Sequence, residues 1–230
     1  MRIIMTLTKN NKTISPEERR TNNNAFIKSL GIMCYEQLPV IEKVEKIKDI
    51  DTICKRAIAC FLSCQLACDI NEDNDVEEST EFFKELLKKY EVSDKLYENE
   101  KQLFTGDYTK QDAINIAWEY ESYWALVWVL GLIDDIKMSD EICDCEKAIA
   151  LFVENEDYNE FKKSCKLRSI DEILDMTDLY FRYHWACVEK SIKPETEIGS
   201  INPDVVIERR KALEWVISDE YDWNDISLDT

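Results

Sequence analysis

The sequence predicts an all-α protein, a single-domain bundle of about eight helices around a Trp-rich central helix. Three observations predict this fold class. The 230 residues include only four Gly and four Pro, which are too few for a turn-rich β-sandwich or barrel. Hydrophobic residues make up 45% of the chain, enough for a packed core. Apolar residues also recur at helical spacing through most of the chain.

Capping residues and turns divide the chain into its predicted helices. In the first helix, Ser15 is the N-cap, Pro16 is the first helical residue and Gly31 follows the C-terminus. The Leu38-Pro39 turn comes next. Seven further helices are expected, and they cover residues 51–68, 79–89, 93–104, 109–130, 140–154, 170–192 and 204–217.

Three of these helices are expected to form the core, and the last of them, residues 204–217, contributes Val205, Val206, Leu213, Trp215 and Val216. Residues 116–132 are apolar nearly all round, which is typical of a helix surrounded by other helices. Residues 170–192 instead carry a single apolar stripe at 3.6-residue spacing. No repeat and no linker divides the chain, so residues 15–230 are predicted to be one helical domain.

The two ends of the chain differ from this helical domain. Residues 1–14 are expected to be an N-terminal extension. Residues 218–230 form an acidic tail that is expected to be irregular. Tyr221 and Trp223 within the tail indicate that it packs back onto the domain.

The sequence favours a cytoplasmic protein. Its first residues lack the apolar region and cleavage site of a signal peptide. The longest uncharged stretch, Ser122 to Ile133, is shorter than the ~18 apolar residues that a membrane-spanning helix needs. The nine cysteines are then expected to be free thiols, because the cytoplasm keeps thiols reduced and the odd count fits poorly with a disulfide framework.

Several kinds of site are not expected. Phosphate-binding loops with several glycines are absent, as are the C-x-x-C pair and the G-x-S-x-G motif of hydrolases. The only histidine is His184, so a His-rich metal site is excluded. Cys60, Cys64 and Cys68 share a helix face, but packing explains them better than a zinc site completed by the Cys143-x-Cys145 pair. We therefore expect neither a metal nor a cofactor.

Several sequence runs resemble the bacterial family called domain of unknown function 4272. The strongest are WEYESYWALVWVLGL (118–132), LRSIDEILDMTDLYFRYHWA (167–186), VVIERRKALEWV (205–216) and DWNDISLDT (222–230). Upstream, the same order is kept by Leu38-Pro39, Lys55-Arg56-Ala57 and Glu100 near Leu103-Phe104, whereas the first 14 residues and Met33-Cys34-Tyr35 depart from the family pattern. The resemblance covers roughly residues 16–230 and implies a mainly helical cytoplasmic protein without an established activity.

Polar residues within the apolar helices are the candidate site. They are Glu121, Asp178, Arg182, His184, Glu208 and Arg209. An unpaired carboxylate in an apolar helix is costly, so each of these residues is expected to have a polar partner and the group to converge from three helices. Two interpretations remain open. The group is either a buried ion-pair network that fixes helix packing, or a catalytic or ligand site with carboxylates beside His and Arg.

The charge balance favours a binding function. Lys and Arg number 29 against 48 Asp and Glu, which gives a net charge of −19. Such a field repels phosphates, so nucleic-acid binding is not expected, and attracts basic proteins. We therefore expect a non-enzymatic binding or regulatory protein, of a toxin-neutralising type for example, with a basic protein partner. The alternative is an enzyme or small-ligand binder that uses Glu121, Asp178, Arg182 and His184.

Overall fold

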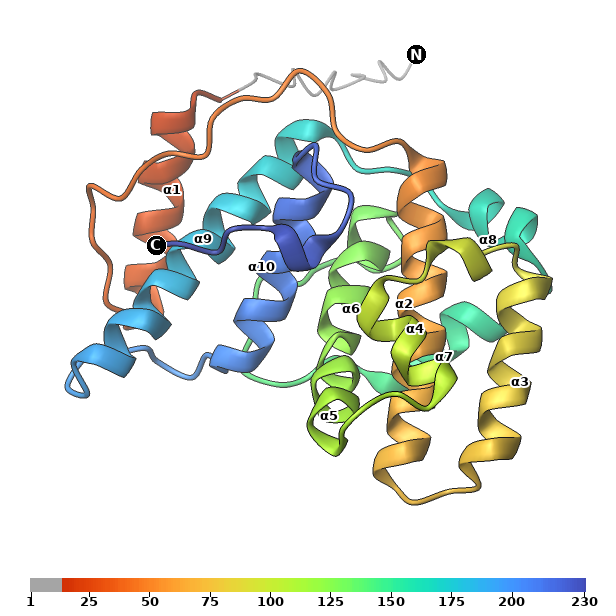
Figure 1. Ribbon diagram of the computed structural model, residues 1–230. Coiled ribbons are helices and arrows are strands. Elements are labelled where there is room, and N and C mark those ends of the chain that lie inside the picture. Colours follow the sequence, from red (N-terminus) through yellow and green to blue (C-terminus); the bar gives the residue numbers. More distant parts are fainter. Residues whose placement is uncertain (1–13) are drawn as a thin grey trace, which may run out of the picture.

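The computed structural model describes residues 14–230 and is built from helices (Figure 1). The α-helices are α1 (Pro16–Ser29), α2 (Ile50–Asn71), α3 (Val76–Lys89), α4 (Glu98–Thr105), α5 (Lys110–Trp118), α6 (Tyr120–Val129), α7 (Cys145–Val153), α8 (Tyr158–Ser164), α9 (Ile170–Ile192) and α10 (Pro203–Ile217). Two 3₁₀ turns, η1 (Ser93–Lys95) and η2 (Trp223–Asp225), complete the set. In this part of the chain the only β-type pairing is an isolated bridge between Ile32 and Ile198. The predicted all-α class is confirmed.

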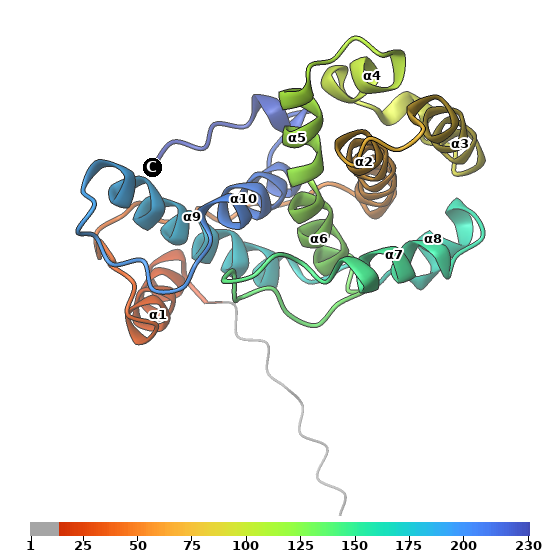
Figure 2. The same cartoon turned by 90° about the horizontal axis from the view of Figure 1, so that it is seen from below.

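Six helices form a row through the molecule. Each helix of the row contacts the next, in the order α1, α9, α10, α6, α2 and α3. Both ribbon views show this order (Figures 1 and 2). Helices α4 and α5 lie on one side of the row, and α7 and α8 lie on the other (Figure 2). Within residues 14–230, no helix has the length and apolar character required to cross a bilayer.

Helix α6 lies between α2 and α10, and every one of its residues is buried. It contains two of the tryptophans, Trp124 and Trp128. Around it, one continuous cluster of buried apolar side chains takes in residues from Ile27 to Trp223. Burial of this apolar surface is the main favourable contribution to folding.

The predicted helix over residues 109–130 is wrong as a single element, because the chain breaks at Glu119 into α5 and α6. At the break the Glu119 amide bonds to the Ile116 carbonyl, three residues back, as in a tightened last turn, and two thiols from α2 contact the carbonyls of Ile116 and Glu119. The Cys60 thiol donates to the Glu119 carbonyl at 3.3 Å, and the Cys64 thiol donates to the Ile116 carbonyl at 3.2 Å. These thiol contacts add to the backbone hydrogen bonds that the two carbonyls accept from the amides of Tyr123 and Glu119.

The predicted helix over residues 140–154 begins later than expected, at Cys145 with Asp144 as its N-cap. Residues before it are held outside the helix by contacts from distant elements. The Glu121 carboxylate accepts a hydrogen bond from the Cys143 amide at 2.6 Å, and the Met138 carbonyl accepts one from Arg209 at 2.8 Å. Helix α8 was not predicted; its N-cap Asp157 accepts from the Glu160 amide.

The C-terminal tail packs against the helices, as its aromatic residues indicated. The Trp223 side chain is only 1% exposed, and Arg210 donates to the carbonyls of Leu228 and Asp229 at 2.9 and 3.1 Å. Apart from η2 the tail has no regular structure. Of the predicted N-terminal extension, residues 1–13 lie outside the described part of the chain.

Two glycines with the same backbone conformation provide a matched test of this packing. Gly131 and Gly31 both have φ +73°. A Cβ at Gly131 would overlap the carbonyl oxygen of Lys166, whereas nothing lies within 4 Å of a Cβ at Gly31. Gly131→Ala should therefore lower the free energy of unfolding by about 2–4 kcal/mol, and Gly31→Ala by about 1 kcal/mol. Urea denaturation measures both values, and equal losses would contradict the packing described.

Candidate functional site

The six polar residues predicted as a site lie on three neighbouring helices. Helix α6 carries Glu121, helix α9 carries Asp178, Arg182 and His184, and helix α10 carries Glu208 and Arg209. Their side chains form several separate networks. Only Glu121 with Arg209 and Asp178 with Arg182 are direct pairs within the set.

The pair of Glu121 and Arg209 joins α6 to α10. The Glu121 carboxylate and the Arg209 guanidinium are 2.8 Å apart, and both side chains are about 3% exposed. Arg209 also donates to the Tyr180 hydroxyl of α9 at 3.1 Å and to the Met138 carbonyl. A buried charge needs its full set of partners, and this arrangement supplies them from three helices and one loop.

The pair of Asp178 and Arg182 ties α9 to α1 and to the Leu38-Pro39 turn. The two side chains are four residues apart on α9, with a nitrogen–oxygen distance of 2.6 Å. Asp178 also accepts from Asn23 of α1 at 2.8 Å, and Arg182 donates to the Pro39 carbonyl at 3.2 Å. Asp178 is fully buried and Arg182 is 1% exposed, so neither is available to a substrate in solution.

His184 contacts Arg210, a residue that the sequence did not single out. The Arg210 guanidinium hydrogen-bonds the Nδ1 atom of His184. Because arginine can only donate, Nδ1 is the acceptor and the imidazole is neutral. Burial, and then the charge of Arg210, lower the pKa of His184 to about 4. The lone histidine is therefore a poor general base at neutral pH.

Glu208 belongs to a further network that contains two residues missed at the sequence level, Glu119 and Lys211. The Lys211 ammonium lies 2.7 Å from Glu208 and 3.3 Å from Glu119. The Ser122 hydroxyl donates to Glu208 at 2.9 Å. Burial raises the pKa of Glu119 to about 7, although Lys211 acts in the opposite direction.

Three consecutive bases on α10 thus serve three different partners. Arg209 binds Glu121, Arg210 binds His184, and Lys211 binds the two glutamates. Successive helical residues point about 100° apart, so neighbouring side chains reach different helices. The run Arg209-Arg210-Lys211 is visible in the sequence, but its spacing does not show which acidic or polar residue each base contacts.

A second missed pair, Arg56 with Glu100, joins α2 to α4. One guanidinium nitrogen lies 2.9 Å from the carboxylate, and both side chains are buried. The guanidinium also lies over the rings of Tyr97 and Trp223, at 4.2 and 4.6 Å from their centroids. Stacking on aromatic faces offsets part of the cost of removing the cation from water.

An open groove lies between α2, α5 and the start of α7, with a volume of about 490 Å³. Three isoleucines at its edges are unusually exposed for their type: Ile114 by 37%, Ile142 by 58% and Ile149 by 40%. Trp118 and Tyr120 contribute aromatic surface. An exposed apolar concavity of this kind marks a binding surface more often than a free face.

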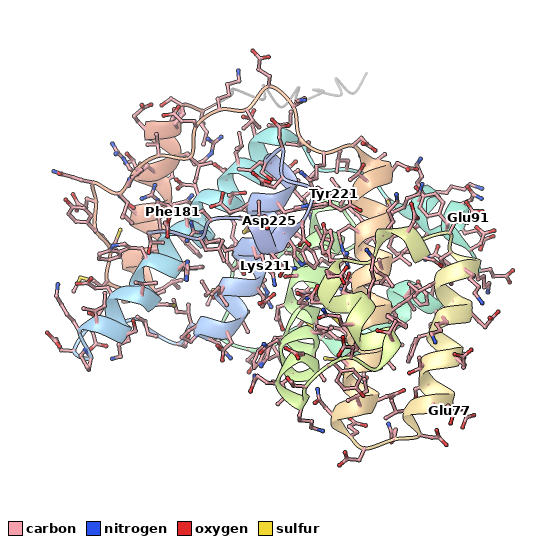
Figure 3. All side chains as sticks on the ribbon, in the orientation of Figure 1. Glu77, Glu91, Phe181, Lys211, Tyr221 and Asp225 are labelled. Atoms are coloured by element: carbon pink, nitrogen blue, oxygen red, sulfur yellow. The ribbon has the colours of Figure 1, made fainter. Side chains whose placement is uncertain are left out.

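The rim of this groove is acidic. Asp69 and Glu72 line it, and its lining contains no Lys or Arg; the third lining carboxylate, Glu121, is buried and paired with Arg209. The flanking stretch of residues 69–78 carries six acidic residues and no base, and residues 134–146 carry six acidic residues against one lysine. Figure 3 shows the acidic side chains of Glu77 and Glu91 at opposite ends of α3, pointing away from the helices.

The cysteines do not form a metal site in the described residues. All nine are free thiols, and residues 14–230 contain no group of three or more His, Cys, Asp or Glu side chains that could hold a metal ion. Cys68, Cys143 and Cys145 instead contribute to the groove wall.

The described part of the chain is all-helical, and its buried charged side chains are paired with one another or with other polar groups of the fold. Comparison with known proteins identifies its family. Residues 19–226 match the family described as domain of unknown function (DUF4272), and the chain belongs to that family. Neither the curated proteins nor the solved structures include a match.

Two ion pairs, one within α9 and one at its C-terminal end, provide a test of a structural role for the buried pair. Arg182→Ala leaves the Asp178 carboxylate buried without its cation, so it should lower the free energy of unfolding by about 3–5 kcal/mol. The matched control is Lys193→Ala, which removes another i, i+4 pair with Glu189 but at an exposed position, and it should change stability little. Similar losses in urea denaturation would contradict a structural role specific to the buried pair.

The environment of His184 predicts a pH dependence of stability. The histidine takes up a proton near pH 6.5 in the unfolded chain but only near pH 4 when folded. Its contribution is therefore full well above pH 6.5 and is lost as the pH falls towards 4, by about 3 kcal/mol.

His184→Gln is the control for this pH dependence, because glutamine cannot be protonated but offers Arg210 an acceptor. The loss of stability between pH 6.5 and 4 should be smaller in His184→Gln than in the natural protein. Urea denaturation across this range measures the difference, and parallel curves would show that His184 does not contribute.

Proposed function

We propose that the protein is a non-enzymatic binding protein that holds a basic segment of a protein partner in the groove between α2, α5 and α7. The observation that carries this proposal is the contrast between interior and surface. The predicted polar residues are paired inside the fold, whereas the groove combines exposed isoleucines with an acidic rim.

The chemistry of the groove specifies the partner's chemistry. Ile114, Ile142 and Ile149 present apolar surface that gains free energy when a partner covers it. Asp69 and Glu72 add negative charge without a lining base to neutralise it. An amphipathic helix with one apolar and one Lys- or Arg-rich face matches both properties. A regulator or a toxin-neutralising protein would bind a basic partner in this way.

The alternative of an enzyme built on Glu121, Asp178, Arg182 and His184 receives less support. Asp178 and Arg182 are closed to solvent, and the Nδ1 atom of His184 is occupied by Arg210. Glu121 reaches the groove wall, but its two oxygens are occupied by Arg209 and by the Cys143 amide. Acid–base chemistry needs a titratable group within reach of a substrate, and this set offers none that is free.

The same proposal places the protein in the cytoplasm. Its nine cysteines are all free, and Cys145 is exposed. A protein with this many unpaired thiols suits a reducing compartment.

Capture from lysate with three forms of the full chain tests the groove. The natural protein should retain basic proteins at about 0.05 M salt and release them at about 0.5 M, because salt screens exposed charges. Ile142→Ser should lower the affinity for those proteins about tenfold, since it removes apolar contact area in the groove.

The matched control is Ile192→Ser, at an isoleucine that is 67% exposed but lies at the end of α9 outside the groove lining. It should bind like the natural protein when each captured partner is purified and titrated. Binding that Ile142→Ser leaves unchanged, or capture of acidic proteins alone, would contradict the proposal.

A further inference from the structure

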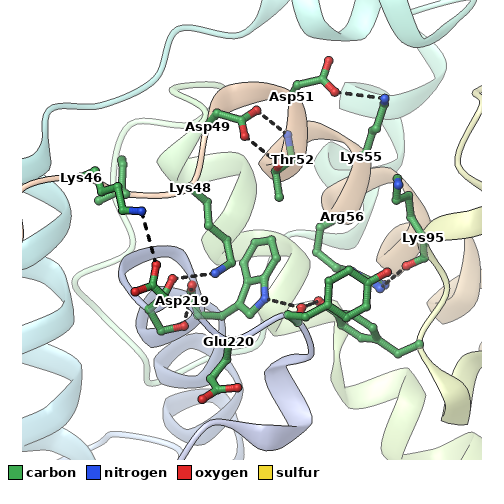
Figure 4. Close-up of a pocket in the computed structure, with 15 residues that line it drawn as sticks. Lys46, Lys48, Asp49, Asp51, Thr52, Lys55, Arg56, Lys95, Asp219 and Glu220 are labelled. Atoms are coloured by element: carbon green, nitrogen blue, oxygen red, sulfur yellow. Dashed lines mark hydrogen bonds and ion pairs between the residues drawn. The ribbon is translucent and has the colours of Figure 1, made fainter.

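A second cleft, separate from the groove, opens at the start of α2. Its volume is about 550 Å³, within the range of small-molecule sites. Three segments form it: residues 46–56, the η1–α4 segment with Lys95 and Tyr97, and the end of α10 with the residues that follow it, from Trp215 to Tyr221 (Figure 4). None of its lining residues belongs to the lining of the groove.

The cleft is unusual in this acidic protein because bases outnumber acids in its lining, by five to four. Most of these charges already have partners within the fold. The pairs are Lys46 with Asp219, Lys55 with Asp51, Lys95 with Asp94, and Arg56 with Glu100. Asp49 is the N-cap of α2 and accepts from the amide and hydroxyl of Thr52.

Lys48 is the one base in the lining that forms no ion pair with a described carboxylate. Among the described residues, no carboxylate lies within ion-pair distance of its ammonium, which donates to the Ser218 carbonyl at 2.7 Å. The ammonium also lies 4.7 Å from the centroid of the Trp215 ring. Figure 4 shows the Glu220 side chain directed away from it.

The surroundings of Lys48 favour a counter-ion. Burial lowers the pKa of this lysine although Asp219 and Glu220 act in the opposite direction, so its charge is under-compensated. The N-terminal end of α2 lies in the same lining, but its N-cap Asp49 and first-turn Asp51 already compensate its partial positive charge, so the attraction for an anion comes from Lys48. An anion beside Lys48 would restore the solvation that the ammonium loses on burial.

We propose that this cleft binds a small organic anion, with its carboxylate or phosphate group on the Lys48 ammonium. The rest of such a ligand would lie along the ring of Tyr221, which is 69% exposed and lines the cleft. The acidic residues Asp219 and Glu220 at the same cleft select against large polyanions. The site is independent of the proposed partner groove.

Titration calorimetry at low ionic strength tests the site with three probes: inorganic phosphate, benzoate and phenyl phosphate. At least one probe should bind the natural full chain saturably. Lys48→Met should weaken that binding about tenfold or more, because it removes a charge-assisted hydrogen bond. Lys46→Met, at a lysine that is 83% exposed and lines the same cleft, should bind nearly as the natural protein does.

A measurement on the natural protein makes the test independent of variant folding. Acetic anhydride labels lysines, and mass spectrometry reports the rate at each position. A probe that binds should slow the labelling of Lys48 several-fold while Lys46 is labelled at its original rate. The proposal is overturned if no probe binds, if Lys48→Met and Lys46→Met lose the same affinity, or if the probe protects both lysines equally.

Discussion

The ion pair between Glu121 and Arg209 is the interaction on which the rest of the structure depends most. It joins α6 to α10, reaches α9 through the Tyr180 hydroxyl, and holds the loop before α7 through Met138 and Cys143. Because Cys143 and the neighbouring Ile142 line the groove, the same pair also fixes one wall of the proposed binding surface. The buried pair of Glu121 and Arg209 therefore helps to set the shape of the groove at the surface.

Buried ion pairs are costly unless every polar atom is satisfied, so their benefit here is geometric. Apolar packing among α6, α9 and α10 alone would tolerate rotation or sliding of one helix past another. Arg209, Arg210 and Lys211 restrict that freedom, because they meet Glu121 of α6, His184 of α9 and Glu119 at the α5–α6 junction. We interpret these networks as determinants of helix register, which explains why charged residues occur within such apolar segments.

Local signals predicted the fold well and the partners poorly. Helix α9 was predicted with its observed bounds because the capping box of Ser169 and Glu172 and the apolar stripe are both local. The break at Glu119 lies where thiols of α2, more than 50 residues away in sequence, contact its carbonyls, and no local pattern encodes that contact. The polar residues could be recognised in sequence as buried, but the partner of His184 follows only from how α10 lies against α9.

Burial of arginine leaves the surface of the protein acidic, and this determines which ligands the two proposed surfaces can bind. In the described residues five arginines and four acidic residues are buried, so the interior is close to neutral and the excess of acid lies outside. The net negative charge of the protein is therefore carried by its exposed residues. The field of those residues attracts cations. A small anion can bind such a protein only at a base that no carboxylate neutralises. Lys48 in the cleft has no described carboxylate within ion-pair distance, whereas the groove, which has no lining base, suits a cationic partner.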